Sequence, residues 1–320
     1  MTTTATLDVI TLGETMVSFA AQEPGPLDAA ATFTKIVAGA ETNVAVGLAR
    51  LGLKVAWLSR LGADSFAAFI RRSLEAEGID CSAVVTDAAR PTGFMLKSRA
   101  LDGQDPVVEY FRRGSAASAL SIADFDAGRF VAARHLHVTG ITPALSQGCA
   151  DLVEHAMKAM RAAGRSISFD PNLRPRLWPS HEAMAGQLNR LAGLADWVLP
   201  GIAEGRTLTG LDTPEEIAAF YLARGARAVT IKLGAEGAYW RTAEGSGRVP
   251  GVRVETVVDT VGAGDAFAAG VISGRLQGLD WPTAVARGNW VGAQVIQVVG
   301  DMDGLPRRAD LPAALAGAGA

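Results

Sequence analysis

Short runs of apolar residues alternate along this chain with stretches in which apolar positions recur every three to four residues. The runs include LDVITLG, KVAWLSRLG, RHLHVTG, SISFD, DWVLP and AVTIKLG, and the helical spacing predicts helices over 41–51, 64–77, 147–163 and 213–224. Strand-length runs that alternate with helix-length periods are typical of stacked βαβ units around a mainly parallel sheet. The pattern therefore predicts an α/β fold.

Two segments, residues 15–38 and 92–113, interrupt this alternation. They contain the extended patterns TMVSFAA, TGFMLKSR and VVEYFRR, separated by Pro and Gly. Because α/β folds bind ligands at the carboxyl ends of their strands, we expect these segments to form a small β-rich lid over that edge. Two surface hairpins without function are the alternative. The expected organisation is one domain over residues 1–320 with a lid.

The composition is that of a globular protein, with 49% hydrophobic and 20% charged residues. The formal net charge is −3 and the basic residues are scattered, which argues against a nucleic-acid partner. No apolar run reaches the length of a membrane span, and Cys81 and Cys149 lack the spacing of a metal or redox motif. We expect a cytoplasmic protein whose partners are small molecules, with neither nucleic acid nor a membrane among them.

The strongest local signal is DTVGAGDAF at 259–267, between a strand-like VRVETVV and a helix-like stretch. A strand, a glycine loop and a helix together present free backbone N–H groups to an anion, and Gly262 and Gly264 allow it to approach closely. A carboxylate at Asp265 would repel a phosphate, but it could accept a proton from an attacking hydroxyl. The alternative is that Asp265 only complements the helix dipole, and the residues alone leave both interpretations open.

Two familiar phosphate-binding motifs are excluded. The chain contains no G-x-x-x-x-G-K-[ST], so it is not a P-loop enzyme. The G-x-G-x-x-G of dinucleotide-binding folds fails at Phe267, which disfavours a nicotinamide-dependent oxidoreductase. His135 and His137 alternate on a predicted strand without a Cys or carboxylate at metal-ligand spacing, so we interpret them as packed strand residues.

The segment Asp259–Gly270, DTVGAGDAFAAG, resembles the C-terminal signature DT-x-GAGD-x-F-x-AG of the ribokinase-like (PfkB) sugar kinases. The opening LGE, AGAETNVAVGLARLG, RLGADSFA and VTIKLGAEGAYW extend the resemblance over essentially the whole chain. It implies a ribokinase-like α/β fold, with a central mainly parallel sheet flanked by helices and a β-rich lid. It also implies phosphoryl transfer from ATP to a sugar.

The resemblance further implies several groups of site residues. The anion hole and catalytic base would be Gly262, Ala263, Gly264 and Asp265. The nucleotide would contact Lys232, Gly234, Gly237, Gly262, Gly264 and Asn289. The sugar would contact Gly39, Asn43 and Asp265. The implied cofactors are ATP and Mg²⁺, and K⁺ is a further candidate because Asp259 and Val261 match positions near a potassium site of some relatives.

The chain departs from the family pattern in two places. Ala38 replaces the first glycine of the pair that ends at Gly39. In the N-x-x-E element, which orders water around Mg²⁺ in the family, Gly201 replaces the Asn while Glu204 is retained. Glu204 is thus the implied indirect magnesium residue, and the arrangement around it is expected to differ.

Three segments narrow the sugar. EYFRRGSA at 109–116, GITPALS at 140–146 and DPNLRPRLW at 170–178 resemble 2-keto-3-deoxygluconate kinases, and the last two also occur in related fructokinases. This resemblance implies that Tyr110, Arg112 and Arg174 contact an open-chain sugar acid, while Met95 replaces a second lid Tyr found in some members. A planar guanidinium suits a carboxylate because it can donate two parallel hydrogen bonds.

The leading hypothesis is ATP-dependent phosphorylation of 2-keto-3-deoxygluconate at its 6-hydroxyl, as in Entner–Doudoroff-type catabolism, with Asp265 as general base. A kinase of the same family that acts on fructose or another ketose is the alternative. A non-catalytic sugar-binding regulator is disfavoured by the intact Asp265. Family members often assemble through their lids, so a homo-oligomer is expected by analogy.

Overall fold

The computed structural model describes residues 7–99 and 106–317, in which a nine-stranded sheet forms the centre of the fold. In spatial order its strands are β13 (Ser246–Val249), β12 (Ala238–Thr242), β11 (Ala228–Lys232), β10 (Trp197–Val198), β9 (Ser166–Asp170), β8 (Ala133–Thr139), β1 (Leu7–Leu12), β4 (Val55–Gly62) and β5 (Val84–Asp87). The strands from β11 to β5 run parallel, and β12 and β13 add an antiparallel edge.

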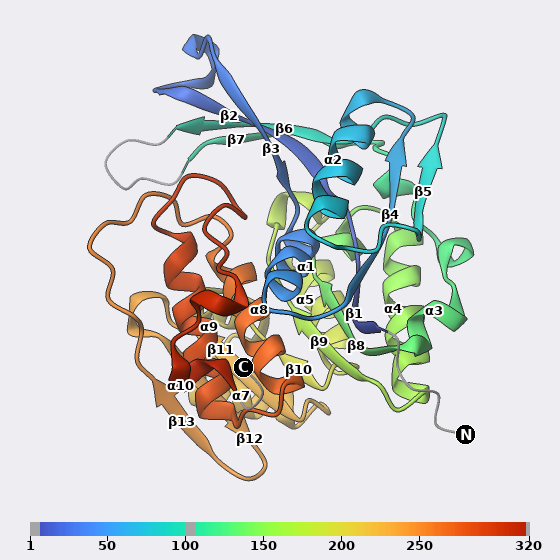
Figure 1. The fold of residues 1–320 in the computed structure, drawn as a ribbon. Coiled ribbons are helices and arrows are strands. Elements are labelled where there is room, and N and C mark those ends of the chain that lie inside the picture. The colour runs from blue at the N-terminus through green and yellow to red at the C-terminus, as the bar shows by residue number, and fades with distance from the viewer. Residues whose placement is uncertain (1–6, 100–105, 318–320) are drawn as a thin grey trace.

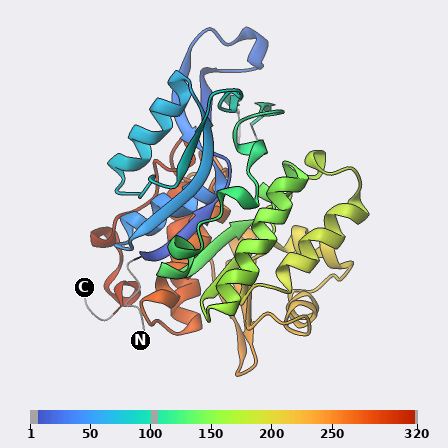
Figure 2. The same cartoon turned by 90° about the vertical axis from the view of Figure 1, so that its right-hand side faces the viewer.

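Helices cover both faces of this sheet (Figures 1 and 2). One face is covered by α1 (Ala40–Arg50), α2 (Ser65–Ala76), α8 (Ala263–Leu276), α9 (Trp281–Val295) and the short α10 (Ala313–Ala316). The other face is covered by α3 (Ala127–Ala132), α4 (Gln147–Ala162), α5 (His181–Ala192), α6 (Ile202–Thr209) and α7 (Pro214–Leu222). Burial of the strands on both sides explains why their sequences are continuous apolar runs.

A second, four-stranded sheet lies above the central one, at the top of Figure 1. Its strands in spatial order are β3 (Phe33–Ala38), β2 (Met16–Pro24), β6 (Phe94–Arg99) and β7 (Val108–Phe111). Only the β2–β6 pair is parallel. We call this sheet the lid. Residues 100–105 of the expected lid, and residues 1–6 and 318–320 of the expected domain, lie outside the described residues.

The structure confirms the predicted fold class and corrects one element. Residues 252–258, which the sequence pattern predicts to be a strand, form none. No neighbouring strand pairs with them, and the backbone N–H groups of Val258 and Asp259 instead donate to the carbonyl of Ile296 at the end of α9. The glycine loop is therefore entered from an extended segment on which Val257 and Val258 are about half exposed.

The two strand histidines are packed core residues, as expected. His135 contacts the Ser166 and Ser168 hydroxyls through its two ring nitrogens at 2.8 and 2.7 Å, and His137 contacts Ser168 at 2.8 Å. Burial lowers the pKa of His137 to about 3 and lowers that of His135 as well, so both rings are neutral and structural. Within residues 7–99 and 106–317, no helix is long and apolar enough to cross a membrane.

The helices α8 and α9 approach each other closely at two glycines, and this contact yields a stability prediction. A Cβ on Gly270 would lie 2.7 Å from the Gly288 Cα, so Gly270→Ala should destabilise the protein by about 1–3 kcal/mol through overpacking. Chemical denaturation measures this loss. As a matched control, Gly186→Ala in α5, where a Cβ meets nothing within 4 Å, should be neutral or slightly stabilising. Equal unfolding midpoints for the two variants would contradict the prediction.

Candidate active site

The loop at the N-terminus of α8 is suited to binding an anion, and we call residues 259–264 the anion-binding loop. Gly262 is the N-cap with φ of +83°, and a Cβ there would lie 2.7 Å from the carbonyl oxygen of Asp301. Only glycine fits both the left-handed conformation and the close approach. The first turn of a helix has N–H groups without intrahelical partners, and in α8 this turn contains Ala263, Gly264 and Asp265. The Ala263 N–H donates to the Thr260 carbonyl at 3.4 Å.

The Asp265 carboxylate is buried in that first turn and is held by two amides. Asn43 of α1 donates to its Oδ2 at 2.8 Å, and Asn172, which follows β9, donates to its Oδ1 at 3.0 Å. Burial, reinforced by the nearby carboxylate of Asp170, raises the pKa of Asp265 to about 7. A carboxyl group poised near neutral pH and fixed on both oxygens is suited to receive a proton.

Lys232, at the end of β11, brings a cation beside this carboxylate. Its ammonium lies 2.6 Å from Oδ2 of Asp170, the last residue of β9. Burial opposes its charge, but Asp170 and Glu204 outweigh that effect and raise the pKa of Lys232. A Cβ on Gly264 would lie 3.4 Å from the Lys232 Nζ, so the lysine faces the anion-binding loop as a permanent positive charge.

These groups open into one cavity of about 460 Å³ between the lid and the sheet edge. The predicted site residues that line it are Gly39, Asn43, Tyr110, Arg112, Arg174, Glu204, Lys232, Gly262, Gly264 and Asp265. Three predicted nucleotide residues do not line it. Gly234 and Gly237 flank the turn after Lys232, and Asn289 donates to the carbonyls of Val249 and Pro250 at 3.1 and 3.0 Å.

The two arginines in the cavity differ in their partners. Arg112 is buried, and its Nε and Nη2 lie 2.6 and 2.5 Å from Oε2 of the buried Glu14. Arg174 is partly exposed, and its guanidinium donates to the backbone carbonyl of Leu173 at 2.9 Å. Among the described residues Arg174 pairs with no carboxylate. The charge of Arg174 acts on Asp265 from a distance and opposes the rise of that pKa. Since Arg174 forms no ion pair, its guanidinium can still bind an anionic ligand, whereas the charge of Arg112 is already compensated.

The carboxylate of Glu204 is held in place by hydrogen bonds from two backbone N–H groups. Its Oε1 accepts from the Leu173 N–H at 2.8 Å, and its Oε2 accepts from the Gly201 N–H at 2.7 Å. Within the part of the chain that the structure describes, no group of three or more His, Cys, Asp or Glu side chains could hold a metal ion.

Sequence reasoning assigned no role to Asn172, Asp170 and Glu14. Asn172 has φ of +40°, which is uncommon for a residue other than glycine, and such conformations cluster at functional sites. Asn172 lies two residues after Asp170, the last residue of β9, at the carboxyl edge of the sheet. Because α/β folds bind ligands at this edge, its place in the sequence could have marked Asn172 as a site residue. Nothing local in the sequence reveals the pairing of Glu14 with Arg112, which lies 98 residues away.

The arrangement supports one class of chemistry. A helix N-terminus and a lysine can bind the phosphates of a nucleotide, and a carboxylate beside them can take the proton of an attacking hydroxyl. Positioning and charge stabilisation of this kind supply most of the rate in phosphoryl transfer. The fold and the site together are those of a phosphotransferase that acts on an alcohol group.

Comparison with known proteins identifies the family. The model of the pfkB family carbohydrate kinases matches residues 6–308, and the chain belongs to this family. It is 54% identical to the 2-dehydro-3-deoxygluconokinase of Bacillus subtilis over 95% of this chain and 94% of that protein. It is 34% identical to the 2-dehydro-3-deoxygluconokinase of Thermoproteus tenax over 94% and 92% of the two chains.

Solved structures show the same fold. A PfkB protein from Polaromonas superposes with a TM-score of 0.89 at 55% identity, covering 96% of this chain and 99% of that one. A candidate ribokinase II from E. coli in complex with ATP and Mg²⁺ gives 0.86 at 28% identity, with coverages of 94% and 96%. A Vibrio cholerae fructokinase double mutant in a fructose, ADP and potassium ion bound form gives 0.82 at 29%, with coverages of 95% and 96%.

The first prediction for the site concerns the buried carboxylate. Asp265→Asn should lower kcat by about 10²-fold or more, because an amide cannot accept the proton. The Asn43 Oδ1 is buried without a partner, so that amide can flip to accept from the new side chain and preserve the packing. An Asp265→Asn variant that keeps more than half of the wild-type turnover would exclude a role of Asp265 as the base.

A pH profile of the wild type tests the same carboxylate. Below pH about 7, kcat/KM should fall tenfold per pH unit, and above it kcat/KM should level off, because only ionised Asp265 is active.

The second prediction concerns Gly201. Its backbone is extended (φ −73°, ψ 156°), and a Cβ there would lie 3.3 Å from Oε2 of Glu204. Gly201→Asn should therefore fold normally and lower the Mg²⁺ concentration needed for half-maximal activity, since it restores a polar group beside Glu204. Activity is measured against free Mg²⁺, with Gly186→Ala as the control. Loss of activity at every Mg²⁺ concentration would contradict the prediction.

Proposed function

We propose that this kinase transfers the γ-phosphoryl group of ATP to the 6-hydroxyl of 2-keto-3-deoxygluconate, giving ADP and the 6-phosphate. The observation that carries the proposal is the Asp265 carboxylate, held by Asn43 and Asn172 at the start of α8 and at the floor of the cavity. Asp265 takes the proton of the hydroxyl, and the N–H groups of residues 262–264 stabilise the transferring phosphoryl group. The names of the relatives at 54% and 34% identity support this substrate.

The surroundings of Arg174 support an acidic sugar as the substrate. Its guanidinium faces the cavity and makes no ion pair with any described residue. A sugar carboxylate would neutralise this guanidinium through charge-assisted hydrogen bonds, which a neutral hexose cannot offer. Tyr110 and Arg112 lie on the lid side of the same cavity, where we propose that they contact the sugar chain. Gly39 and Asn43 approach it from α1.

A fructokinase of the same family is the alternative, since a Vibrio cholerae fructokinase shares the fold. The uncompensated Arg174 favours the acid. A non-catalytic sugar-binding regulator is less favoured, because the proposed base and anion hole are intact. An ADP-release assay over a panel of neutral ketoses and sugar acids distinguishes these functions: a rate on fructose above that on 2-keto-3-deoxygluconate, or no turnover at all, would overturn the proposal.

ATP and Mg²⁺ are bound by a related kinase, and we propose the same cofactors here. The residues fit them: Lys232 and the α8 N-terminus would hold phosphates, and Glu204 would orient water around the ion. Gly234, Gly237 and Asn289 surround the turn after Lys232 and are proposed to border the nucleoside. The match of Asp259 and Val261 to a potassium site stays a prediction, and the Asp259 carboxylate is already paired with Lys97 at 2.6 Å.

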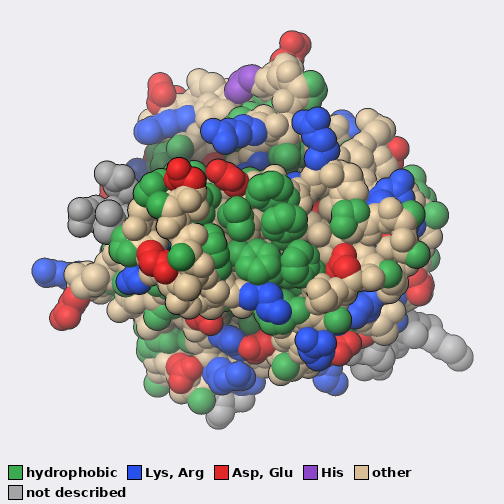
Figure 3. Space-filling view, turned by 90° about the horizontal axis from the view of Figure 1, so that it is seen from above, with side chains coloured by type: hydrophobic (Ala, Val, Ile, Leu, Met, Phe, Trp, Pro, Cys, Tyr) green, Lys and Arg blue, Asp and Glu red, His purple; other side chains and the backbone are tan. Residues whose placement is uncertain are grey.

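We further propose that residues 1–320 form one domain that assembles into a homo-oligomer through the outer face of the lid. Phe94 stacks on Phe111 at 4.7 Å on that face, and Phe111 is 48% exposed. Hydrophobic side chains gather on the surface seen from above the lid (Figure 3), as at many interfaces. Analytical ultracentrifugation tests the assembly.

A cytoplasmic location is a separate proposal. Cys81 and Cys149 are buried free thiols, which fits the reducing environment of the cytoplasm. Cell fractionation tests this location.

The substrate assignment leads to a prediction about Arg174. Arg174→Ala should raise KM for 2-keto-3-deoxygluconate about tenfold to a hundredfold, because a charge-assisted contact contributes roughly 1.5–3 kcal/mol. Arg174→Lys should recover only part of the loss, and the rate on a neutral ketose should change little. Arg112→Ala is a poorer test because it leaves the buried Glu14 without its partner. Equal losses on the acid and on fructose would show that Arg174 does not read the carboxylate.

A further inference from the structure

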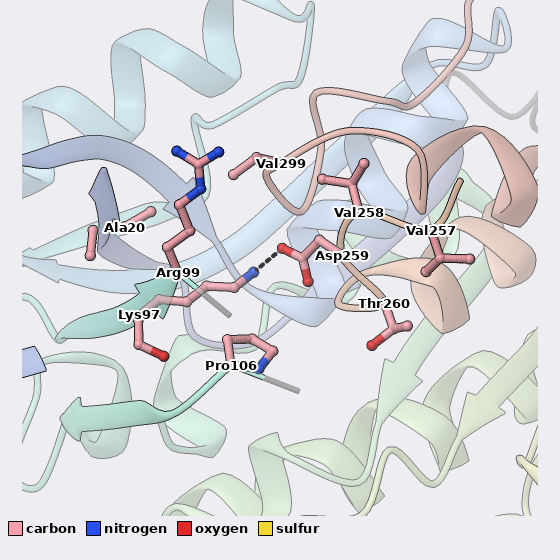
Figure 4. Close-up of a pocket in the computed structure, with 11 residues that line it drawn as sticks. Ala20, Lys97, Arg99, Pro106, Val257, Val258, Asp259, Thr260 and Val299 are labelled. Atoms are coloured by element: carbon pink, nitrogen blue, oxygen red, sulfur yellow. Dashed lines mark hydrogen bonds and ion pairs between the residues drawn. The ribbon is translucent and has the colours of Figure 1, made fainter. Parts of the chain in front are cut away.

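A buried lysine of the lid connects the lid to the anion-binding loop. Lys97 lies on β6, and only 4% of its side chain is exposed. Its ammonium lies 2.6 Å from Oδ2 of Asp259 and 3.1 Å from Oδ1 of Asp301, and Figure 4 shows the contact with Asp259. These partners are 162 and 204 residues away along the chain. The family resemblance assigns no role to Lys97.

Both residues contact the anion-binding loop, Asp259 through its carboxylate and Asp301 through its backbone. Asp259 begins the loop, and its Oδ1 accepts from the backbone N–H of Val261 at 3.0 Å. Asp301 packs from the other side, with its carbonyl oxygen and Cα against the position where Gly262 would carry a Cβ. A shift of the Lys97 ammonium would therefore be transmitted to the loop at both of its supports.

The same strand also reaches the proposed sugar cavity. Met95 and Lys97 both line this cavity. Phe94 points to the opposite side of the strand, where its ring contacts the rings of Phe19 and Phe111. Alternate residues of a strand share one face, so one face of β6 contacts the cavity through Met95 and supports the loop through Lys97. A sugar that orders this strand also orders the cation beneath the anion-binding loop.

The charges explain why this cation matters. Asp259 and Asp301 are both almost fully buried, with 8% and 5% of their side chains exposed. Without Lys97, two carboxylates would face each other directly behind a loop that must accept phosphate. Removing one partner of a buried ionic cluster leaves an uncompensated charge, and here that charge would repel the nucleotide. Burial and the neighbouring Asp259 already act to raise the pKa of Asp301.

We propose that Lys97 is a positioning residue that couples placement of the lid over the sugar to assembly of the anion hole. The anion hole is then complete only when the lid is in place, which ties binding of ATP phosphates to the presence of the sugar. This inference rests on the proposed kinase function. It extends that function by assigning a role in phosphoryl transfer to a lid residue whose ammonium is paired with Asp259 and Asp301.

The test begins with Lys97→Ala and Lys97→Met. Each should lower kcat about a hundredfold, the loss that a misplacement of about 1 Å produces in a reacting site, and should raise KM for the sugar much less. The matched control is Arg99→Ala, which removes a cation of the same strand whose side chain, within the described residues, donates to the Gln22 carbonyl. The control should stay within twofold of the wild type. A Lys97 variant that also stays within twofold would overturn the proposal.

Two rescues separate a role of charge from a role in packing. Methylammonium chloride should raise the kcat of Lys97→Ala at least tenfold over the same concentration of tetramethylammonium chloride, because the small cation fits the space left by the ammonium. The double variant Lys97→Met with Asp301→Asn removes both charges of one pair, so it should fold and should be more active than Lys97→Met alone. A loss that neither change relieves would reveal a packing role and overturn the proposal.

A binding measurement tests the coupling without turnover. In calorimetric titrations of the wild type, saturating 2-keto-3-deoxygluconate should tighten binding of a non-hydrolysable ATP analogue, and the tightening should vanish in Lys97→Met. Equal tightening in both proteins would overturn the role of Lys97. If the wild type prefers another sugar, the substrate proposal fails while the Lys97 comparison is made on that sugar. If no sugar binds or is phosphorylated, both proposals fail.

Discussion

Burial of the Asp265 carboxylate is the constraint on which the rest of the site depends. A carboxylate removed from water is costly unless hydrogen bonds replace its hydration. Its two amide partners come from α1 and from the loop after β9, while Asp265 itself begins α8. These three elements can meet only where parallel strands end at a common edge, so the strand order of the central sheet is a condition for holding this group.

The second constraint is that buried charges, besides apolar contacts, join the lid to the core. Glu14 pairs with Arg112, and Lys97 pairs with Asp259 and Asp301. On the other side of the lid, Phe19 and Phe94 pack against Phe66 of α2. Buried ion pairs contribute little net stability, because desolvation offsets much of the attraction. They do demand one geometry, since each charge is satisfied only by its partner. The buried charges thus specify the position of the lid, while its apolar contacts with the core contribute to holding it there.

Much of this could be predicted from the sequence because the relevant signals are local. The alternation of apolar runs with helical periods predicts the α/β sheet, and the glycine loop before α8 predicts an anion site. The strand expected over residues 252–258 is wrong because its β-prone valines have no neighbouring strand to pair with. The pairs of Glu14 with Arg112 and of Lys97 with Asp259 join residues far apart in the chain, so no spacing rule reveals them.

The charge balance of the cavity gives the two arginines different roles. Four cationic side chains line it: Lys97, Arg112, Arg174 and Lys232. Three of them are paired with buried carboxylates, and Arg174 makes no such pair within the described residues. A ligand with one negative charge beside Arg174 would give this fourth cation an anionic partner. A neutral ketose would leave the guanidinium solvated by water. Selectivity for a sugar acid would then come from one uncompensated cation among three compensated ones, and not from the number of basic residues in the cavity.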